Sequence, residues 1–481
     1  MDDLKKQILA LSKISSALEP SEAQRDGIFK EVQQYANTFL NNLPSTKAYS
    51  PEKAKKEVFS ITSEVKPLKK ILEIYNSEVA AKGIHPASGG HLGYIPGGGI
   101  YTSALADYLV DITNEYAGLS FASPGAVAME HELLNWMKSL FGFPESAIGN
   151  LTSGGSIANM IGLTSARDKH KIKGAKIEKS VVYLSPQLHH SCLKALRIIG
   201  LEDIIIRHLQ LDSNSKIIPE DFSEKLQQDK ENGLEPFLLI ASGGTTDTGA
   251  VDPLKELGEI ANQNKLWYHI DAAYGGFFIL TEQRKKLFEG IEMADSLAVD
   301  PHKGLFLPFG LGAVLVKDKE AVFHSHHHSA NYMQDAHTEV SRVDPADVSP
   351  ELTKHFRALR LWLPLQLHGI APFTACLEEK LLLTRYFREK MLDSGFKVGP
   401  EPDLSVTYFW WPRDENEDEF NKKVLKEIHE DGTVFLSSTL IDGKFVIRLA
   451  VLSFRTKIET IDRAVEVLIS IVRKLEIKFK V

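Results

Sequence analysis

The segment Leu266-Trp267-Tyr268-His269-Ile270-Asp271-Ala272-Ala273 decides how this chain folds and where its chemistry lies. It begins as an apolar run typical of a buried β-strand and ends on a carboxylate, so Asp271 is expected at the strand's carboxyl end. Further along, Asp300-Pro301-His302-Lys303-Gly304 follows a second apolar run. Its proline and glycine indicate a tight turn around Lys303. The sequence therefore predicts an acid and an amine, each just beyond an apolar run.

Lys303 and Asp271 together predict a site for pyridoxal 5′-phosphate (PLP). PLP enzymes need an amine that holds the cofactor as a Schiff base and an acid that keeps the pyridine nitrogen protonated. Burial favours the uncharged, nucleophilic form of a lysine, so Lys303 suits the first task and Asp271 the second. Either residue alone is better explained as a surface charge or a turn former. Their joint occurrence with the loops below favours PLP.

Three other loops place polar groups after apolar runs. Leu151-Thr152-Ser153-Gly154-Gly155-Ser156 precedes a predicted helix over 157–169, whose N-terminus would attract a phosphate. Gly243-Gly244-Thr245-Thr246-Asp247-Thr248 follows an apolar strand over 236–240 and supplies hydroxyls. Ser185-Pro186-Gln187-Leu188-His189-His190-Ser191 offers an imidazole that could lie flat on an aromatic ring. Each loop alone is a common structural turn.

The composition is that of a soluble globular protein. The chain has 481 residues, 43% of them hydrophobic and 25% charged, with a net charge of −8. An acidic balance argues against a nucleic-acid partner, and no apolar run is long enough for a membrane span. The two cysteines, Cys192 and Cys376, lie far apart in the sequence and support neither a disulfide framework nor a thiolate metal site. A reducing cytoplasm is the expected location.

The chain is expected to contain three parts. Residues 1–97 predict a helical segment with a break at Pro20, a second helix from Ser50 to about Ala81, and a glycine-rich loop. Residues 98–370 alternate helices with buried strands, as in an α/β domain with a mostly parallel sheet. Residues 371–481 predict a smaller α+β domain.

The ordered motifs Thr152 to Ser156, His190-Ser191, Gly244-Thr245-Thr246, Asp271-Ala272-Ala273-Tyr274 and Pro301-His302-Lys303 resemble those of the group II PLP-dependent amino-acid decarboxylases. The resemblance covers nearly the whole chain and is closest to the aromatic-L-amino-acid branch. It implies the fold of the type I PLP enzymes, with a seven-stranded, mostly parallel sheet. It also implies a homodimer with shared active sites and an L-amino acid as substrate.

The resemblance also implies residue roles. Lys303 is the expected Schiff-base lysine, Asp271 the partner of the pyridine nitrogen, and His190 the imidazole stacked on the cofactor ring. Tyr332 matches the loop tyrosine that protonates the substrate carbon, on a segment from about His324 to Pro350 that closes over the site. The expected cofactor-binding residues are Gly154, Gly155, Ser156, His190, Thr246, Asp271, Ala273, Asp300, His302 and Lys303.

Three residues depart from the aromatic branch. Asp300 stands where these enzymes tend to have asparagine, and an anion is unfavourable beside a phosphate. Gly304 replaces a bulky tryptophan, and Ile95 occupies a position that is often aromatic. The last two changes leave the shape of an aromatic substrate pocket open.

Several alternatives stay open from the sequence. The substrate could be an acidic amino acid, glutamate or aspartate, and the reaction could be that of an aminotransferase or a carbon–carbon lyase. A non-enzymatic relative that acts as a binding partner is disfavoured by intact Lys303 and Asp271. The cluster His324-Ser325-His326-His327-His328 lacks a carboxylate at ligand spacing, so no metal is expected.

Overall fold

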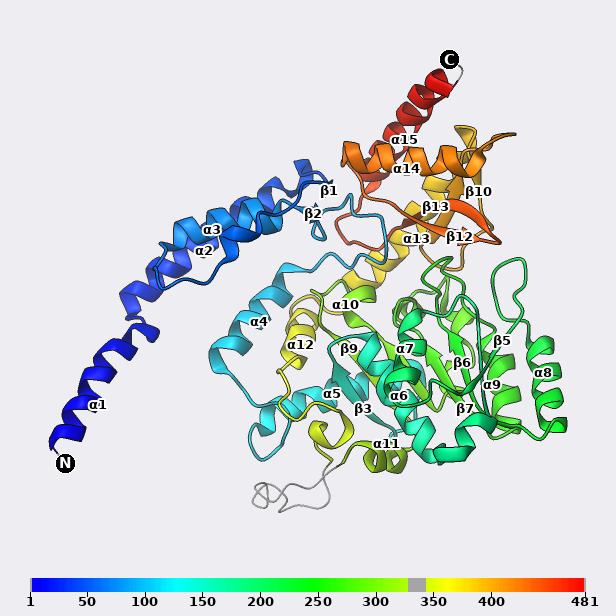
Figure 1. Ribbon diagram of the computed structural model, residues 1–481, viewed down its shortest axis with the longest axis horizontal. Helices are drawn as coiled ribbons and strands as arrows, with labels where there is room; N and C mark the ends of the chain where they lie inside the picture. The colour runs from blue at the N-terminus through cyan, green and yellow to red at the C-terminus, as the bar shows by residue number, and fades with distance from the viewer. Residues whose placement is uncertain (1, 328–342, 480–481) are drawn as a thin grey trace.

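The structure is a computed structural model that describes residues 2–327 and 343–479. Tyr332 lies outside these residues, so its predicted role stays a prediction. Three parts follow one another along the chain, an N-terminal helical arm, a large α/β part and a smaller α+β part (Figure 1).

In the described chain the main sheet has seven strands, which confirms the expected α/β architecture. Their spatial order is β3 (Ile148–Thr152), β9 (Gly312–Val316), β8 (Ser296–Val299), β7 (Trp267–Asp271), β6 (Glu235–Ser242), β4 (Ser180–Leu184) and β5 (Ile205–His208). The strands from β8 to β5 are parallel, and β9 is antiparallel to both of its neighbours. The carboxyl ends of the parallel strands therefore meet at one edge of the sheet.

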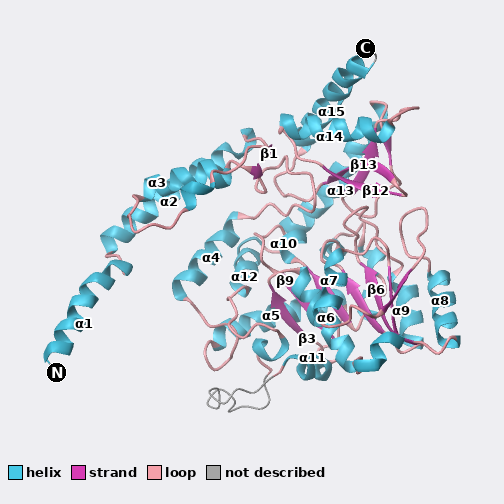
Figure 2. Ribbon diagram, in the orientation of Figure 1, coloured by secondary structure: helices cyan, strands magenta, loops and turns pink. Residues whose placement is uncertain are grey.

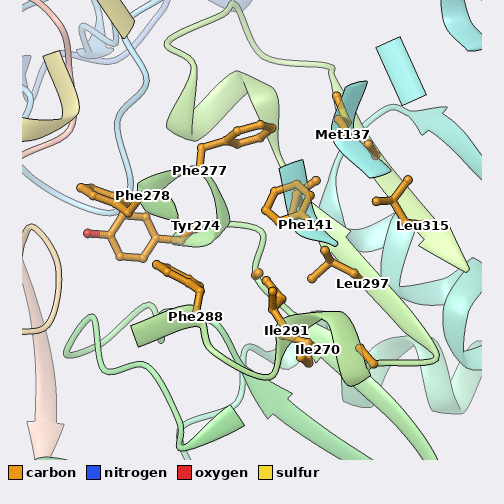
Figure 3. Close-up of a cluster of buried hydrophobic side chains, with 14 of the residues drawn as sticks. Met137, Phe141, Ile270, Tyr274, Phe277, Phe278, Phe288, Ile291, Leu297 and Leu315 are labelled. Atoms are coloured by element: carbon orange, nitrogen blue, oxygen red, sulfur yellow. The ribbon is translucent and has the colours of Figure 1, made fainter. Parts of the chain in front are cut away.

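The apolar runs of the strands are buried on both faces of the sheet. Side chains alternate across a strand, so Leu238 and Ile240 of β6 enter one hydrophobic core while Leu239 and Ala241 enter another. The first core also contains side chains of α6 (Gly155–Lys169), and the second contains Phe141 of α5 (Pro124–Phe141) with the aromatic cluster in Figure 3. Such two-sided burial explains why the strands read as continuous apolar runs rather than as alternating ones.

The helices of the large part connect or cover these strands (Figure 2). They are α4 (Tyr101–Thr113), α5 (Pro124–Phe141), α6 (Gly155–Lys169), α7 (His190–Ile198), α8 (Pro219–Glu231), α9 (Leu254–Gln263), α10 (Pro301–Gly304), α11 (Lys319–His326) and α12 (Ala358–His368).

The N-terminal arm extends away from the large part (Figure 1). It contains α1 (Asp2–Ser15), α2 (Glu22–Asn42), β1 (Tyr49–Ser50), α3 (Leu68–Tyr75) and β2 (Gly83–Ile84). The predicted break at Pro20 is present, and Ser21 caps α2 together with the side chain of Gln24. The long second helix predicted from Ser50 is wrong, because regular α-helix begins only after Pro67. The prolines at both ends of this stretch each restrict the preceding residue to extended backbone.

The C-terminal part has its own sheet and core. It contains α13 (Ala371–Asp393), β10 (Lys397–Val398), β11 (Val406–Trp410), α14 (Glu417–Asp431), β12 (Ser437–Ile441), β13 (Lys444–Ala450) and α15 (Ile458–Phe479). The strands form an antiparallel sheet in the order β10, β11, β13, β12. Helices α13, α14 and α15 contribute to one hydrophobic core with this sheet.

Candidate active site

A cavity of about 360 Å³ lies at the carboxyl edge of the main sheet. Its wall comes from the loops after β3, β4, β6, β7 and β8, so segments far apart in the sequence meet there. Nine of the predicted cofactor residues line it, namely Gly154, Gly155, Ser156, Thr246, Asp271, Ala273, Asp300, His302 and Lys303. Small-molecule sites commonly have at least this volume and combine a few convergent polar groups with fixed walls.

Lys303 enters the cavity from the short helix α10, which directly follows β8. Its Nζ lies 3.1 Å from Oδ2 of Asp300, and the lysine side chain is 22% exposed whereas the aspartate is 1% exposed. The second carboxylate oxygen of Asp300, Oδ1, is buried without a hydrogen-bond partner. The Lys303 amine is thus accessible from the cavity and held next to a buried carboxylate.

His302 is the neighbour of this lysine and also lines the cavity. Its Nδ1 donates a hydrogen bond to the carbonyl oxygen of Leu311 at 2.6 Å, which leaves Nε2 on the side of Asp300. Burial lowers the pKa of His302, so the imidazole is neutral at physiological pH.

Asp271 is the last residue of β7 and is held by hydrogen bonds on both carboxylate oxygens. Oδ1 accepts from the backbone N–H of Ala273 at 3.1 Å, and Oδ2 accepts from Nδ2 of Asn159 at 3.0 Å. The Sγ of Cys192 lies 3.6 Å from the same Oδ2. These contacts fix the orientation of the carboxylate toward the cavity that it lines.

The N-terminus of α6 forms the phosphate-binding loop that the sequence predicts. Gly154 is its capping residue and has a φ of 152°, a conformation that favours glycine. A Cβ on Gly155 would lie 3.0 Å from both Cβ of Ala273 and Oδ2 of Asp300. The two glycines therefore keep the entrance of the helix open, where backbone amides and the helix dipole favour an anion.

The structure places His189 in the cavity wall, whereas His190, the residue predicted to stack on the cofactor ring, is exposed and is not part of the wall. The Nδ1 of His189 accepts from the backbone N–H of Ser191 at 3.3 Å and lies 2.7 Å from its Oγ, so the ring nitrogen Nε2 carries the proton. Burial lowers the pKa of His189, which keeps this ring neutral. His190 begins α7, and the turn of the helix directs it outward.

Sequence reasoning missed several polar residues near this site. Asn159, Ser191, Ser242 and Thr245 line the cavity. Helical periodicity offers a signal for Asn159, because it lies one turn after Gly155 on the same face of α6. Ser191 and Thr245 belong to loops that the sequence already singles out, without a role assigned to them, and Ser242 directly precedes one of these loops.

Arg448 of β13 is a buried cation next to the cavity wall. It is 2% exposed, its Nε donates to the carbonyl oxygen of Asp247 at 3.2 Å, and its Nη2 is buried without a partner. Burial lowers its pKa to about 10, so the guanidinium still carries its charge at neutral pH.

Gly304 and Ile95 do not line the cavity. A Cβ on Gly304 would lie 2.8 Å from Cβ of Phe277, whose ring packs against Phe141 in the core (Figure 3). Ile95 is 9% exposed and belongs to the same hydrophobic core. In this chain both residues therefore pack in the core, outside the cavity wall that contains Lys303.

The described residues contain no group of three or more His, Cys, Asp or Glu side chains that could hold a metal ion. Within the same residues, no helix has the length and apolarity needed to cross a membrane. The histidines of α11 include His326, whose Nδ1 lies 3.1 Å from a backbone carbonyl oxygen.

The residues of the cavity fit PLP. The cofactor needs an amine, an acid and an anion-binding loop, and these are supplied by Lys303, Asp271 and the N-terminus of α6 in one cavity. A Cβ on Gly154 would approach Cε1 of His302 at 3.5 Å, so a side chain there would narrow the loop from the cavity side.

Comparison with known proteins agrees with this arrangement. Residues 51–411 match the family model described as the pyridoxal-dependent decarboxylase conserved domain. The aromatic-L-amino-acid decarboxylase of Bacillus atrophaeus is 34% identical over 399 residues, which cover 81% of this chain and 82% of that protein. A phenylacetaldehyde synthase of Arabidopsis thaliana is 30% identical over 404 residues, covering 80% and 82%.

A solved structure supports the fold. The Oryza sativa enzyme TDC, in a structure with PLP and tryptamine, superposes with a TM-score of 0.90 at 22% sequence identity, covering 95% of this chain and 99% of that one. This likeness confirms the expected type I fold, and the matches in sequence confirm PLP as the cofactor and decarboxylation of amino acids as the enzyme class. The chain belongs to the pyridoxal-dependent decarboxylase family.

Proposed function

We propose that this enzyme decarboxylates aromatic L-amino acids and releases carbon dioxide and the corresponding amine. The observation that carries the proposal is the single cavity that holds the Lys303 amine, the Asp271 carboxylate and the N-terminus of α6. The choice of aromatic substrates rests on the aromatic-L-amino-acid decarboxylase that matches most of this chain. No acidic or basic side chain is required to bind an aromatic ring, so the charged cavity residues remain available for the cofactor and the amino-acid backbone.

Each cavity residue has a separate task in this proposal. Lys303 supplies the amine that attaches the cofactor, and the α6 N-terminus binds its phosphate. Asp271 would hold a proton on the pyridine nitrogen, and the neutral ring of His189 would form part of the wall that holds the cofactor. When bound, PLP supplies the electron sink for the carbon that loses carbon dioxide. The negative charge of Asp271 would thereby stabilise the positive charge of the protonated pyridine nitrogen. Electrostatic stabilisation of this kind is often the largest single contribution to enzymatic rate enhancement.

We assign the substrate carboxylate to Arg448. Its buried guanidinium has an unpaired Nη2 and contacts the residue after Thr246, which lines the cavity. A buried cation with an open donor favours an anionic ligand, because the charge is otherwise left uncompensated. Nη2 would donate to the substrate carboxylate and so orient the bond to be broken, while Nε and Nη1 keep their partners Asp247 and Ser437.

Protonation of the substrate carbon is assigned to Tyr332, as the sequence predicts. A second candidate function is oxidative conversion to an aldehyde, in which dioxygen and water are consumed and carbon dioxide, ammonia and hydrogen peroxide are released, because phenylacetaldehyde synthase is among the matching proteins. Delivery of a proton to the substrate carbon gives the amine. The two functions therefore differ in what happens to that carbon after carbon dioxide has left. Product analysis separates them.

We further propose that the enzyme acts as a cytoplasmic homodimer. The arm helices α1, α2 and α3 contain no buried residue, and apolar side chains such as Leu11, Ile14 and Phe29 are exposed on them. A second copy of the chain would cover this surface. Both cysteines are free, which suits a reducing compartment.

The substrate assignment is tested by incubating the purified, PLP-loaded enzyme with each natural L-amino acid and measuring carbon dioxide, amine and aldehyde. We expect one or more of the aromatic amino acids to give carbon dioxide and amine in equal amounts. Turnover confined to glutamate or aspartate would refute the substrate, and aldehyde in place of amine would refute the reaction. Size-exclusion chromatography with light scattering tests the dimer separately.

A further inference from the structure

A chain of buried polar side chains lies behind Asp271. Trp267, His269 and Asp271 alternate along β7, so all three point to the face of the sheet that α6 covers. Asn159 of α6 contacts both His269 and Asp271. Ser296 of β8 stands directly opposite His269 in the strand register and contacts both His269 and Trp267. The five side chains thus link the cavity to the interior beneath α6.

The distances define a continuous series of hydrogen bonds. Nε1 of Trp267 lies 2.8 Å from Oγ of Ser296, which lies 2.7 Å from Nδ1 of His269. Nε2 of His269 lies 3.0 Å from Oδ1 of Asn159. Nδ2 of Asn159 then lies 3.0 Å from Oδ2 of Asp271.

Only one set of proton positions satisfies every contact in this series. The carboxylate of Asp271 is an acceptor only, so Nδ2 of Asn159 donates to it and Oδ1 of Asn159 faces Nε2 of His269. Nε2 of His269 must then carry the proton that Oδ1 accepts, which leaves Nδ1 as an acceptor. The hydroxyl of Ser296 donates to Nδ1, and its oxygen accepts from the indole of Trp267. The network therefore assigns both the tautomer of His269 and the orientation of the Asn159 amide.

The surroundings exclude water and keep the imidazole uncharged. Asn159, His269 and Ser296 are fully buried, and burial lowers the pKa of His269 to about 4. Asp271 is the charged group that opposes this shift. Gly162, one turn after Asn159, allows the close approach of α6, because a Cβ there would lie 3.0 Å from Nδ1 of His269 and from Oγ of Ser296.

We propose that His269 is a positioning residue for catalysis, which together with Ser296 and Trp267 locks the Asn159 carboxamide so that it donates to Asp271. Without the His269 donor the buried Oδ1 of Asn159 has no partner, although Nδ2 still donates to Asp271 and, at 3.2 Å, to Oγ of Ser191. An unpaired buried acceptor is costly, so the carboxamide shifts to relieve it and holds the carboxylate of Asp271 less firmly in its orientation toward the cavity. The inference rests on the role proposed above for Asp271.

Two substitutions at one position separate this role from packing. His269→Gln keeps a donor near the place of Nε2, whereas His269→Phe keeps a ring of similar size but has no donor. We expect His269→Phe to weaken PLP binding and lower kcat by about tenfold to a hundredfold with a smaller change in KM. His269→Gln should recover most of both losses. If packing alone mattered, the phenylalanine variant would be the less damaged of the two.

A second measurement needs neither cofactor nor activity. Selective ¹⁵N labelling of histidine in the cofactor-free protein, with His269→Gln to assign the signal, should show the directly bonded proton on Nε2 of His269. Ser296→Ala removes the donor to Nδ1, and it should weaken PLP binding less than His269→Phe does. A proton on Nδ1, or equal PLP affinity and kcat in the glutamine and phenylalanine variants, would overturn the inference.

The failure of this inference can be told apart from a failure of the proposed role of Asp271. Asp271→Asn removes the charge itself and is compared with Asp295→Asn, at a half-buried carboxylate outside the cavity wall. If Asp271→Asn keeps full activity, the proposed function of the acid fails whatever the His269 variants do. If Asp271→Asn is inactive while His269→Phe is unchanged, only the positioning role fails.

Discussion

The Nζ of Lys303 lies 3.1 Å from Oδ2 of Asp300, which stands three residues earlier on the same turn and has its other oxygen buried without a partner. The same Oδ2 is the atom that a Cβ on Gly155 would approach at 3.0 Å. Asp300 therefore lies between the amine and the loop proposed to bind phosphate. The lysine balances a charge that would otherwise repel the cofactor.

This relationship predicts that Asp300→Asn strengthens PLP binding. The substitution keeps the shape of the side chain and removes a negative charge near the proposed phosphate, so we expect the affinity to rise by about threefold to tenfold, a small part of the full Coulomb interaction. The dissociation constant is measured by titrating the cofactor-free protein with PLP and following its fluorescence. Weaker PLP binding by Asp300→Asn would contradict this prediction. It would mean that the Asp300 carboxylate favours PLP binding through its contact with Lys303 by more than it disfavours binding through repulsion of the phosphate.

Exchange of the two adjacent histidines for alanine tests which of them faces the cofactor. His189→Ala should lower kcat/KM by about a hundredfold, because the ring lines the cavity and fixes one face of the site. His190→Ala is the matched control, and it should stay within about twofold of the unchanged enzyme because surface substitutions are mostly neutral. Steady-state rates of carbon dioxide release measure both. A large loss of kcat/KM in His190→Ala, without one in His189→Ala, would instead support His190 as the residue that faces the cofactor.

The histidine pair also shows where the sequence stops being sufficient. The motif after β4 correctly predicts an imidazole at the cavity, but the choice between His189 and His190 depends on the residue at which α7 begins. Helix ends are uncertain by one or two residues even in a known structure. His189 is the capping residue and His190 is the first helical residue. An error of one position in the predicted start of α7 therefore selects the exposed histidine in place of the one that lines the cavity.

Most of the fold followed from local patterns, whereas contacts between distant segments did not. The apolar run ending at Asp271 became β7, and the run before the lysine turn became β8, because buried strands carry a strong signal. Nothing local to Gly304 indicates that Phe277 occupies the adjacent space. The same holds for Arg448, whose partner Asp247 is 201 positions away in the sequence.

The core position of Gly304 predicts an effect on stability and none on substrate choice. Gly304→Ala would place a methyl group 2.8 Å from Cβ of Phe277, so the core must shift. Such overpacking typically costs about 1–3 kcal/mol of unfolding free energy. Urea unfolding should show this loss, while the ratio of kcat/KM values among aromatic amino acids stays constant. A changed ratio would place Gly304 back in the substrate pocket.

The buried His269 predicts a pH dependence of folding stability. Its pKa is about 4 in the folded protein against an ordinary 6.5, so the unfolded chain binds a proton first as the pH falls. The stabilisation is complete above pH 6.5 and is lost progressively between pH 6.5 and 4. From pH 7 to pH 4.5 the loss amounts to about 2.5 kcal/mol, at about 1.4 kcal/mol for each pKa unit.

Comparison with His269→Gln isolates this contribution, because other titrating groups act equally in both proteins. The unfolding free energy of the cofactor-free enzyme should fall more steeply with decreasing pH than that of the variant. Parallel curves for the two proteins would show that His269 is not held in its neutral form.

Attachment of the cofactor to Lys303 is the central claim, and borohydride reduction of the PLP-loaded enzyme followed by peptide mass mapping tests it most directly. Reduction converts the bond between lysine and cofactor into a stable amine. We predict one modified peptide that carries the phosphopyridoxyl group on Lys303, and none in the Lys303→Ala variant. Modification of a different lysine, or an unmodified Lys303 in enzyme that has bound PLP, would contradict the assignment of this cavity.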